Sequence, residues 1–491
     1  MIPYISTSDD YMKFQRREKS RLTYSDFQRL HEDKMFKFAK KKMRLLEPER
    51  IREPLVSCYA PKMVIPAIYT LYIIRSFLLM LIFGYTSIDK WVRAVKADIL
   101  LQYLIGTWNV PSISAHYDFI NRVTHTNPTF TELYPKNKNS RFTKAKIREL
   151  QLKAGEKWVN FDDGDTFSLA KKYKDNADCD KHRPSRTLEN IFNLLVVQPS
   201  MEKFINGDFI LSGDGTALHI HSNLFGHHVE NPVDDDHAQR YTAPTADCGW
   251  DSDLGVWYFG FTLFTISYHS KEMGIDFPMF ITLRTASQHD ALTTISATAQ
   301  MLDVNPSLLP KYICFDSASD AAHIHRFLRL RGMIPIIDWN PRHSSSKNPY
   351  DECNITNTKI SKNGIPVCAR GDEMCRDGYD YSKMATKFRC PLVCGRVHSC
   401  QFAETCSPSS YGRVVKIFDK TNYKLFGPVP HNSEEWKEIY KNRTSTERIN
   451  KRILKDYKLE ALTCYNESKH FFFSIIAGIN IHLDAWAKKA A

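Results

Sequence analysis

Between residues 200 and 345 the chain alternates β-type and helical segments in an order that few folds accommodate. Three segments in a row are rich in β-branched and aromatic residues and predict strands at 207–223, 255–269 and 277–287. The patterns that follow predict helix, strand, helix and strand at 289–302, 311–320, 321–332 and 333–339. This order is typical of a mixed α/β sheet.

Two aspartates, Asp214 and Asp316, follow the apolar parts of two predicted strands. In open α/β sheets, ligands collect at strand ends, where a rigid sheet positions side chains. Two carboxylates brought together there repel one another unless a cation lies between them, and paired divalent metals use such oxygen ligands. An aspartate after a strand is also a common turn former. Gly213 and Gly215 favour the functional interpretation, because glycines let a large ligand approach the backbone.

Residues 438–458 predict one helix with a basic surface. Positions three or four apart share one stripe of a helix, and here the stripe contains Tyr440, Arg443, Glu447, Lys451 and Lys455. Glu447 is the one acid between Tyr440 and Lys455. Ion pairs four residues apart explain the spacing but leave an excess of positive charge. We therefore interpret Glu447 as a metal ligand among bases that bind phosphate.

The order of a strand with Asp214, a strand with Asp316 and a helix with Glu447 resembles the DDE transposases of bacterial insertion sequences. Tyr440-x2-Arg443-x3-Glu447 is similar to the Y-x2-R-x3-E signature of that group. The final Lys of the signature is displaced: position 454 is Leu, and Lys455 follows it. Residues 312–340 resemble the strand, Asp, helix and strand block of the family. The resemblance covers about residues 60–488.

The resemblance implies an enzyme that binds terminal inverted repeats, hydrolyses a DNA strand to free a 3′-OH, and transfers that hydroxyl into target DNA. Asp214, Asp316 and Glu447 would be catalytic and would hold two Mg²⁺ ions, with Mn²⁺ as a substitute. Tyr440, Arg443, Lys451 and Lys455 would contact DNA. The resemblance further implies a homodimer on double-stranded DNA, in the cytoplasm of a bacterium or archaeon and associated with the nucleoid.

The expected fold class is α+β and multidomain. The expected regions are a basic N-terminal arm (1–55), a helical domain with a basic linker (56–200), an α/β core (201–345 and 411–491) and a Cys-rich insertion (346–410). The resemblance implies that the helical domain binds DNA and that the core is ribonuclease H-like. The net charge of +12 favours polyanionic partners such as DNA. Residues 64–85 are nearly long enough to span a membrane. Arg75 at the centre of that segment favours a buried core helix, and the polar N-terminus predicts no signal peptide.

The insertion is rich in cysteine. Cys390, Cys394, Cys400 and Cys406, with His398 nearby, are enough soft ligands for a structural zinc ion. Their spacing lacks paired C-x2-C motifs, so free thiols without a metal are the favoured alternative.

Two other functions fit parts of the sequence. A metal-dependent hydrolase would use histidines such as His219 and His221, which alternate on a strand, whereas His323 and His325 lie two apart on a helix and do not share a face. A domesticated, non-catalytic DNA-binding regulator would keep the DNA contacts without cleavage.

Overall fold

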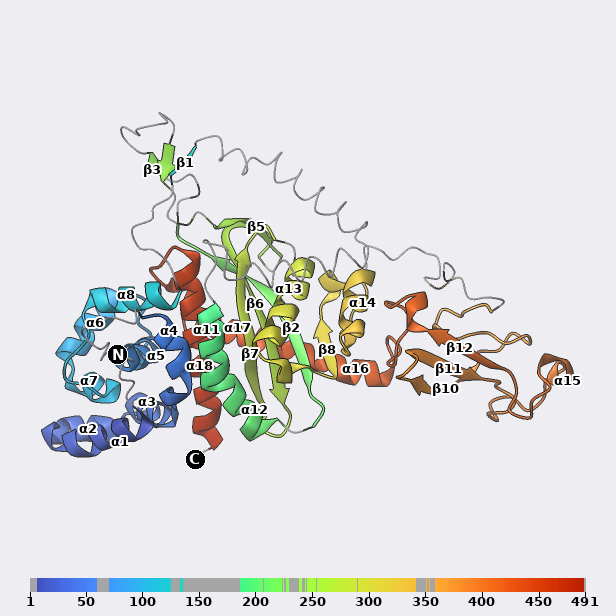
Figure 1. Ribbon diagram of the computed structural model, residues 1–491, viewed down its shortest axis with the longest axis horizontal. Helices are drawn as coiled ribbons and strands as arrows, with labels where there is room; N and C mark the ends of the chain where they lie inside the picture. Colours follow the sequence, from blue (N-terminus) through green and yellow to red (C-terminus); the bar gives the residue numbers. More distant parts are fainter. Residues whose placement is uncertain are drawn as a thin grey trace.

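A computed structural model describes residues 7–59, 70–124, 133–135, 186–340, 350, 353 and 358–489, with short gaps at 206, 223, 225–226, 229–237, 241–242, 244, 253 and 289. The chain folds into a mixed α/β structure in which N-terminal helices, a central sheet and a projecting insertion follow one another along the longest axis (Figure 1). Residues 136–185, in the part of 56–200 where the basic linker is expected, lie outside the described residues.

The central sheet confirms the predicted mixed sheet. Its strands are β2 (Ile210–His219), β5 (Asp247–Asp251), β6 (Val256–Ser270), β7 (Ile275–Thr285), β8 (Tyr312–Phe315) and β9 (Ile334–Ile337). β6 pairs antiparallel with β2, β5 and β7, whereas β8 is parallel to both β2 and β9. β2 therefore lies between an antiparallel and a parallel neighbour.

Helices cover both faces of this sheet. They include α11 (Arg186–Phe192), α12 (Gln198–Phe204), α13 (Asp290–Val304), α14 (Ala322–Leu330), α16 (Glu434–Tyr440), α17 (Thr444–Lys451) and α18 (Glu467–Lys489). Ser212 of β2 contacts α17, while a Cβ at Gly215 would meet Asp290 of α13. Successive side chains of a strand point to opposite faces, so α13 and α17 lie on opposite faces of the sheet.

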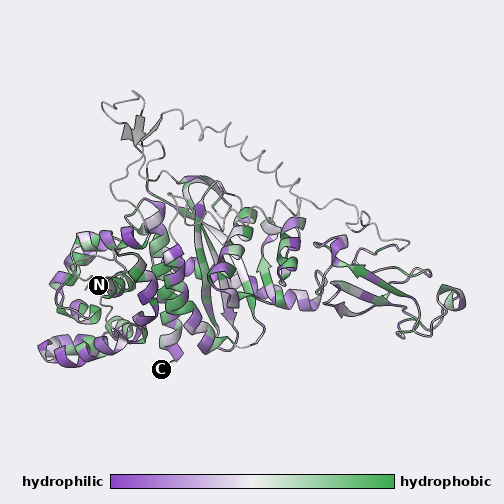
Figure 2. Cartoon of the chain, viewed as in Figure 1, coloured by the Kyte–Doolittle hydropathy of each residue, from purple (hydrophilic) through white to green (hydrophobic). Residues whose placement is uncertain are grey.

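The N-terminal part is a helical layer packed against α18. Its helices are α1 (Ser8–Arg17), α2 (Tyr24–Glu32), α3 (Lys34–Leu45), α4 (Arg52–Ser57), α5 (Thr70–Ile82), α6 (Ile88–Ala97), α7 (Ile99–Ile105) and α8 (Ile113–Val123). Ser87 and Ser112 cap α6 and α8, and Gly106 ends α7 in a left-handed conformation. α5 is mostly hydrophobic, while α1 and α2 are largely hydrophilic (Figure 2).

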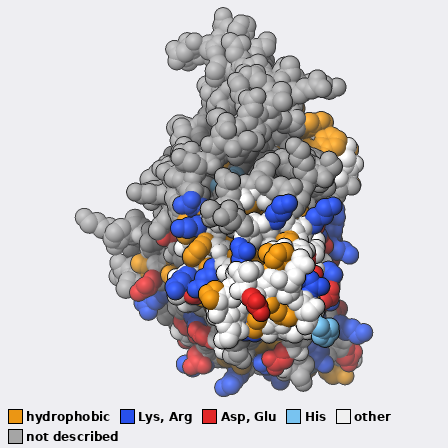
Figure 3. All heavy atoms as spheres, turned by 90° about the vertical axis from the view of Figure 1, so that its right-hand side faces the viewer, with side chains coloured by type: hydrophobic (Ala, Val, Ile, Leu, Met, Phe, Trp, Pro, Cys, Tyr) orange, Lys and Arg blue, Asp and Glu red, His pale blue; other side chains and the backbone are white. Residues whose placement is uncertain are grey.

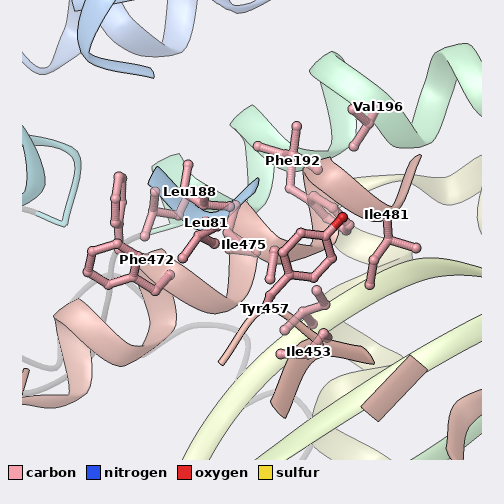
Figure 4. Packing of buried hydrophobic residues seen from close by; sticks show 14 of the residues in the cluster. Leu81, Leu188, Phe192, Val196, Ile453, Tyr457, Phe472, Ile475 and Ile481 are labelled. Atoms are coloured by element: carbon pink, nitrogen blue, oxygen red, sulfur yellow. The ribbon is translucent and has the colours of Figure 1, made fainter. Parts of the chain in front are cut away.

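Residues 8–57 are not a solvated arm, because they form helices that share the core of the molecule. One hydrophobic cluster runs from α1 to α18 and includes Leu81, Leu188, Phe472 and Ile481 (Figure 4). Lys42 of α3 is buried and forms a 2.7 Å ion pair with Asp484 of α18. The expected border at residue 55 is therefore not a border between separate cores.

Arg75 lies inside α5 and is fully buried, with its guanidinium 4.0 Å from the centre of the Tyr11 ring. This cation–π contact accounts for a charge in an apolar helix. In the part of the chain that the structure describes, none of the helices is both long and apolar enough to cross a membrane.

The insertion has a sheet and a small core of its own. Its elements are β10 (Cys375–Asp380), β11 (Ala385–Arg389), α15 (Ala403–Cys406) and β12 (Val414–Phe418). Its cluster contains Tyr350, Ile360, Met374, Phe388, Ile417 and Phe426. The insertion therefore extends beyond the expected border at 410, because β12 pairs with β11. A separate small sheet joins β1 (Leu133–Pro135), β4 (Ala238–Arg240) and β3 (His227–His228).

Candidate active site

Asp214 and Asp316 are brought together by the parallel pairing of β2 and β8. Residues 210–212 pair with 312–314, and the same register continued by two residues sets Asp316 beside Asp214. The sequence suggested that Asp214 lies at a strand end, but in the structure it lies within β2. β2 continues to His219 because its pairing with β6 continues after β8 has ended.

The two glycines beside Asp214 have a different role from the one the sequence suggested. A Cβ at Gly213 would lie 2.3 Å from the Phe315 ring, and one at Gly215 would lie 2.8 Å from an oxygen of Asp290. Both contacts are too short for a real Cβ atom. The glycines are therefore required for the packing of neighbouring side chains around Asp214.

Glu447 reaches the same place from α17, which is held on the sheet by a buried cluster of four hydroxyl groups. Ser445 Oγ lies 2.7 Å from both Ser212 Oγ and Ser267 Oγ. Thr446 Oγ1 lies 2.7 Å and 2.8 Å from the same two atoms. Buried hydroxyls that satisfy one another specify a single arrangement, and this one places Glu447 next to the β2–β6 pair.

Arg443 links two of the three predicted catalytic acids. Its Nη2 donates a hydrogen bond to Glu447 Oε1, and its Nη1 lies 3.6 Å from Asp214 Oδ2. Arg443 belongs to a short 3₁₀ turn, Lys441–Arg443, between α16 and α17. The helix predicted at 438–458 is thus interrupted, but Tyr440, Arg443 and Glu447 remain on adjacent turns.

A fourth carboxylate, Asp290 at the start of α13, interacts electrostatically with Asp214 and Asp316 and was missed in the sequence. Burial, together with the charge of Asp316, raises the pKa of Asp290 to about 6. An acid in the first turn of a helix is ordinarily explained by the helix dipole, so its spacing alone does not distinguish it. Its position after the third predicted strand was the one available signal.

The acids act on one another electrostatically. Burial and then the negative charge of Asp316 raise the pKa of Asp214 to about 8, with smaller contributions from Asp290 and Glu447. Arg443 opposes this shift. Carboxylates crowded in this way favour a proton or a cation between them.

Tyr440 lies beside this cluster. Its ring stacks on Trp436 with centroids 4.5 Å apart, and burial raises the pKa of its hydroxyl to about 12. α16 is fixed to β8 where the Cys314 thiol donates to the Ile439 carbonyl at 3.5 Å. Tyr440 is therefore held near the site by packing as well as by sequence.

Two other bases of the predicted helix, Arg448 beside the stripe and Lys455 within it, are paired with acids, which weakens the argument from excess charge. Arg448 binds Asp276 through two hydrogen bonds of 2.6 and 2.7 Å. Lys455 pairs with Glu460. Lys451, one turn after Glu447, is exposed. The sequence could not show these pairs because their acids lie on other elements or after the helix.

Carboxylate oxygens are the ligands that Mg²⁺ prefers, so the donor set at Asp214, Asp316 and Glu447 suits the implied metal. The side chains are not preassembled: across the described ranges, no group of three or more His, Cys, Asp or Glu side chains is already arranged to hold a metal ion. Arg443 lies between two of the acids and offsets their charge.

The same result bears on the predicted zinc set. Cys390, Cys400 and Cys406 line one cavity, whereas Cys394 is exposed. Cys394 instead forms a hydrogen bond with Cys375, whose pKa is raised first by burial and then by this partner. The four cysteines chosen from the sequence are therefore not neighbours as one set.

The histidines of the hydrolase alternative have structural partners. His219 pairs with Asp251 at 2.9 Å and stacks on Tyr258, and His221 lies 3.2 Å from the Glu460 carbonyl oxygen. His325 is buried 3.4 Å from Asp320. Burial lowers the pKa of His323 to about 4.

Comparison with protein-family models, with curated proteins and with solved structures found no match to this chain.

Proposed function

We propose that this chain is a DNA transposase of the DDE type, which cleaves and transfers DNA strands with divalent metal ions. The observation that carries the proposal is the meeting of Asp214, Asp316, Glu447 and Arg443, which come from two strands and a helix far apart in the sequence. The strand order β7, β6, β2, β8 and β9 supports a ribonuclease H-like core. In this order β6 is antiparallel to β7 and β2, and β8 and β9 are parallel to β2.

Paired Mg²⁺ ions at these carboxylates would supply Lewis-acid activation of the attacking oxygen and stabilise the leaving oxygen. The residues of the chain have their own tasks. Asp214, whose carboxyl feels the charges of Asp316, Asp290 and Glu447, would hold metal together with Asp316 and Glu447. Arg443 offers a planar guanidinium that binds phosphate bidentately, and Tyr440 offers a ring beside it.

A basic groove supports DNA as the substrate. A cavity of about 400 Å³ between α2 and α3 is lined by His31, Lys37, Lys40, Lys41 and Arg44. Burial and the charges of Arg44 and Lys19 lower the pKa of Lys40, which indicates a concentrated positive potential. Such a surface attracts the phosphate backbone independently of base sequence. Lys and Arg side chains also occur on the face at the insertion end (Figure 3).

A supercoiled-plasmid nicking assay in Mg²⁺ or Mn²⁺, combined with calorimetric titration of Mn²⁺, tests the proposal. We expect Asp214→Asn, Asp316→Asn and Glu447→Gln each to reduce nicking by at least about 100-fold, because each removes a ligand of the reacting metals. Asp208→Asn is the control, since Asp208 is an exposed acid paired with Lys311. Equal nicking by Asp316→Asn and wild type would contradict the proposal.

The position of Arg443 favours one alternative, a DNA-binding regulator without cleavage. An arginine that already offsets Asp214 and Glu447 gives the acids a purely structural partner. Sequence-specific DNA binding with neither nicking nor Mn²⁺ binding by the wild type would support this alternative.

A further inference from the structure

The far end of the insertion has little hydrophobic core. All of residues 390–413 are described, and in this stretch Pro391 is the single buried residue. α15 has four residues and buries none of them. The cluster around Met374 and Phe388 includes no residue of this segment. Small units with so little buried apolar surface generally require a disulfide or a metal ion to become stable.

Four cysteine side chains line one cavity of about 80 Å³ at this end. Cys368 comes from the loop before β10, Cys390 follows β11, Cys400 precedes α15, and Cys406 is the last residue of α15. All four are half-buried. Three separate stretches of chain thus bring cysteines to one cavity. The four thiols are not preassembled around a metal position. Cys368 also packs against the cluster around Met374, whereas Cys390, Cys400 and Cys406 belong to neither that cluster nor its packed neighbours.

The walls of the cavity preserve this arrangement. A Cβ at Gly412 would lie 2.7 Å from Cβ of Cys390, and the positive φ of 72° at Gly412 also favours glycine. Cys368 accepts a hydrogen bond from Gly371 and donates one to Asp372 through the backbone, which forms a tight turn that presents its side chain.

We propose that Cys368, Cys390, Cys400 and Cys406 bind one structural zinc ion that holds the end of the insertion together. Four thiolates are a common tetrahedral ligand set for structural zinc, and the thiols release their protons to solvent on binding. The set differs from the one expected from the sequence, because Cys368 replaces Cys394. Cys394 belongs to a separate pair with Cys375.

The charges around the cavity suit this ligand set. Zinc with four thiolates carries a net charge of about minus two. Arg370 and Arg413 line the same cavity and offset it, while Asp372 is paired with Arg370 at 3.3 Å. Because Pro391 is the one buried anchor of 390–413, closing these loops onto an ion disturbs little packing. Metal binding and folding are coupled in this way at many structural zinc sites.

The test measures zinc in the purified full-length protein by elemental analysis, after reconstitution with Zn²⁺ and removal of loosely bound metal. We expect about one zinc per chain in the wild type. Cys368→Ser and Cys400→Ser should lose it, and Cys394→Ser, the matched control, should keep it. A wild type without zinc would overturn the proposal, and so would loss of zinc in Cys394→Ser with retention in Cys368→Ser.

A second measurement does not depend on the variants being folded. Wild-type protein reconstituted with Co²⁺ should show the intense thiolate-to-cobalt charge-transfer absorption and the visible bands of a tetrahedral sulfur site. Octahedral, thiolate-free spectra would contradict the proposal. The outcome is independent of DNA cleavage, because none of these cysteines lies at the candidate active site.

Discussion

Single residues of β2 decide how closely the surrounding side chains approach Asp214. From the sequence, Gly213 and Gly215 were interpreted as openings for a ligand. In the structure, the side chains of Phe315 and Asp290 fill the space beside these glycines. A sequence shows that a position needs a small residue, but the side chain that fills the space comes from another strand or helix and is not visible in the local pattern.

Substitution of Gly213 tests whether the Phe315 ring fills the space beside this position. In Gly213→Ala the new Cβ would lie 2.3 Å from the Phe315 ring in a filled core. We expect a loss of about 1–3 kcal/mol in the free energy of unfolding, because an overpacked core must shift side chains or backbone. Chemical denaturation measures it. Gly427→Ala is the control, since nothing lies within 4 Å of its Cβ position. Equal stability of the two variants would contradict the prediction.

At the scale of elements, the predicted strands and most helices were confirmed, whereas the interactions between them were not predictable. The spacing of Tyr440, Arg443 and Glu447 did place them together. The acids that balance Arg448 and Arg452 are Asp276 on β7 and Asp484 on α18, and periodicity within one helix carries no information about them. The hydroxyl cluster at Ser445 was missed for the same reason.

The C-terminal helix α18 is fixed by a buried hydrogen-bond chain. His482 Nε2 donates to the Pro278 carbonyl at 2.8 Å, and its Nδ1 accepts from Ser200 Oγ at 2.7 Å. Ser200 in turn accepts from Trp486 Nε1 at 2.9 Å. The chain works only with a neutral imidazole, because a protonated Nδ1 could not accept.

This predicts a loss of stability in acid. Burial lowers the pKa of His482 to about 4 from 6.5. As the pH falls from 6.5 to 4, the unfolded chain takes up a proton and the folded chain does not, so the free energy of unfolding falls. His482→Gln should lower the melting temperature at pH 7.5 and make its decrease toward pH 5 shallower than in the wild type. His323 and His470 remain in this variant, and burial also lowers their pKa values to about 4. Part of the decrease in melting temperature therefore persists. Thermal melts across this range measure it, and parallel profiles would contradict it.

At the scale of the whole molecule, the sequence indicated the order of the regions but not which of them share one hydrophobic core. Composition marks basic, helical and Cys-rich stretches, but it does not reveal that α1 to α8 and α18 share one cluster. The border of the insertion was misplaced because β12 has a sequence typical of any strand. Trp339 and His431, whose rings stack 4.2 Å apart, mark where the insertion leaves and rejoins the core.

Two shortened chains test which regions are needed for the core of the molecule to fold. A chain beginning at residue 186 should not unfold cooperatively, because it exposes the face of α18 that α3 and α5 cover and leaves Asp484 without Lys42. A matched chain in which a short linker replaces 341–429 should keep a cooperative thermal transition, since it leaves that shared cluster intact. Calorimetry compares the two. A cooperative transition in the first chain, near the wild-type temperature, would contradict the prediction.

Asp484 connects elements that are far apart in the sequence. Its carboxylate holds Lys42 of α3 at 2.7 Å, and both Arg452 and the Tyr457 hydroxyl, which follow α17, at 2.5 Å. The same α3 carries Lys37, Lys40, Lys41 and Arg44 of the basic groove. If DNA binds the basic groove, as proposed, a displacement of α3 reaches the end of α17 through this buried network. Under the proposed function, DNA binding at the groove and the position of Glu447 would be coupled through Asp484 and the hydrophobic cluster around it.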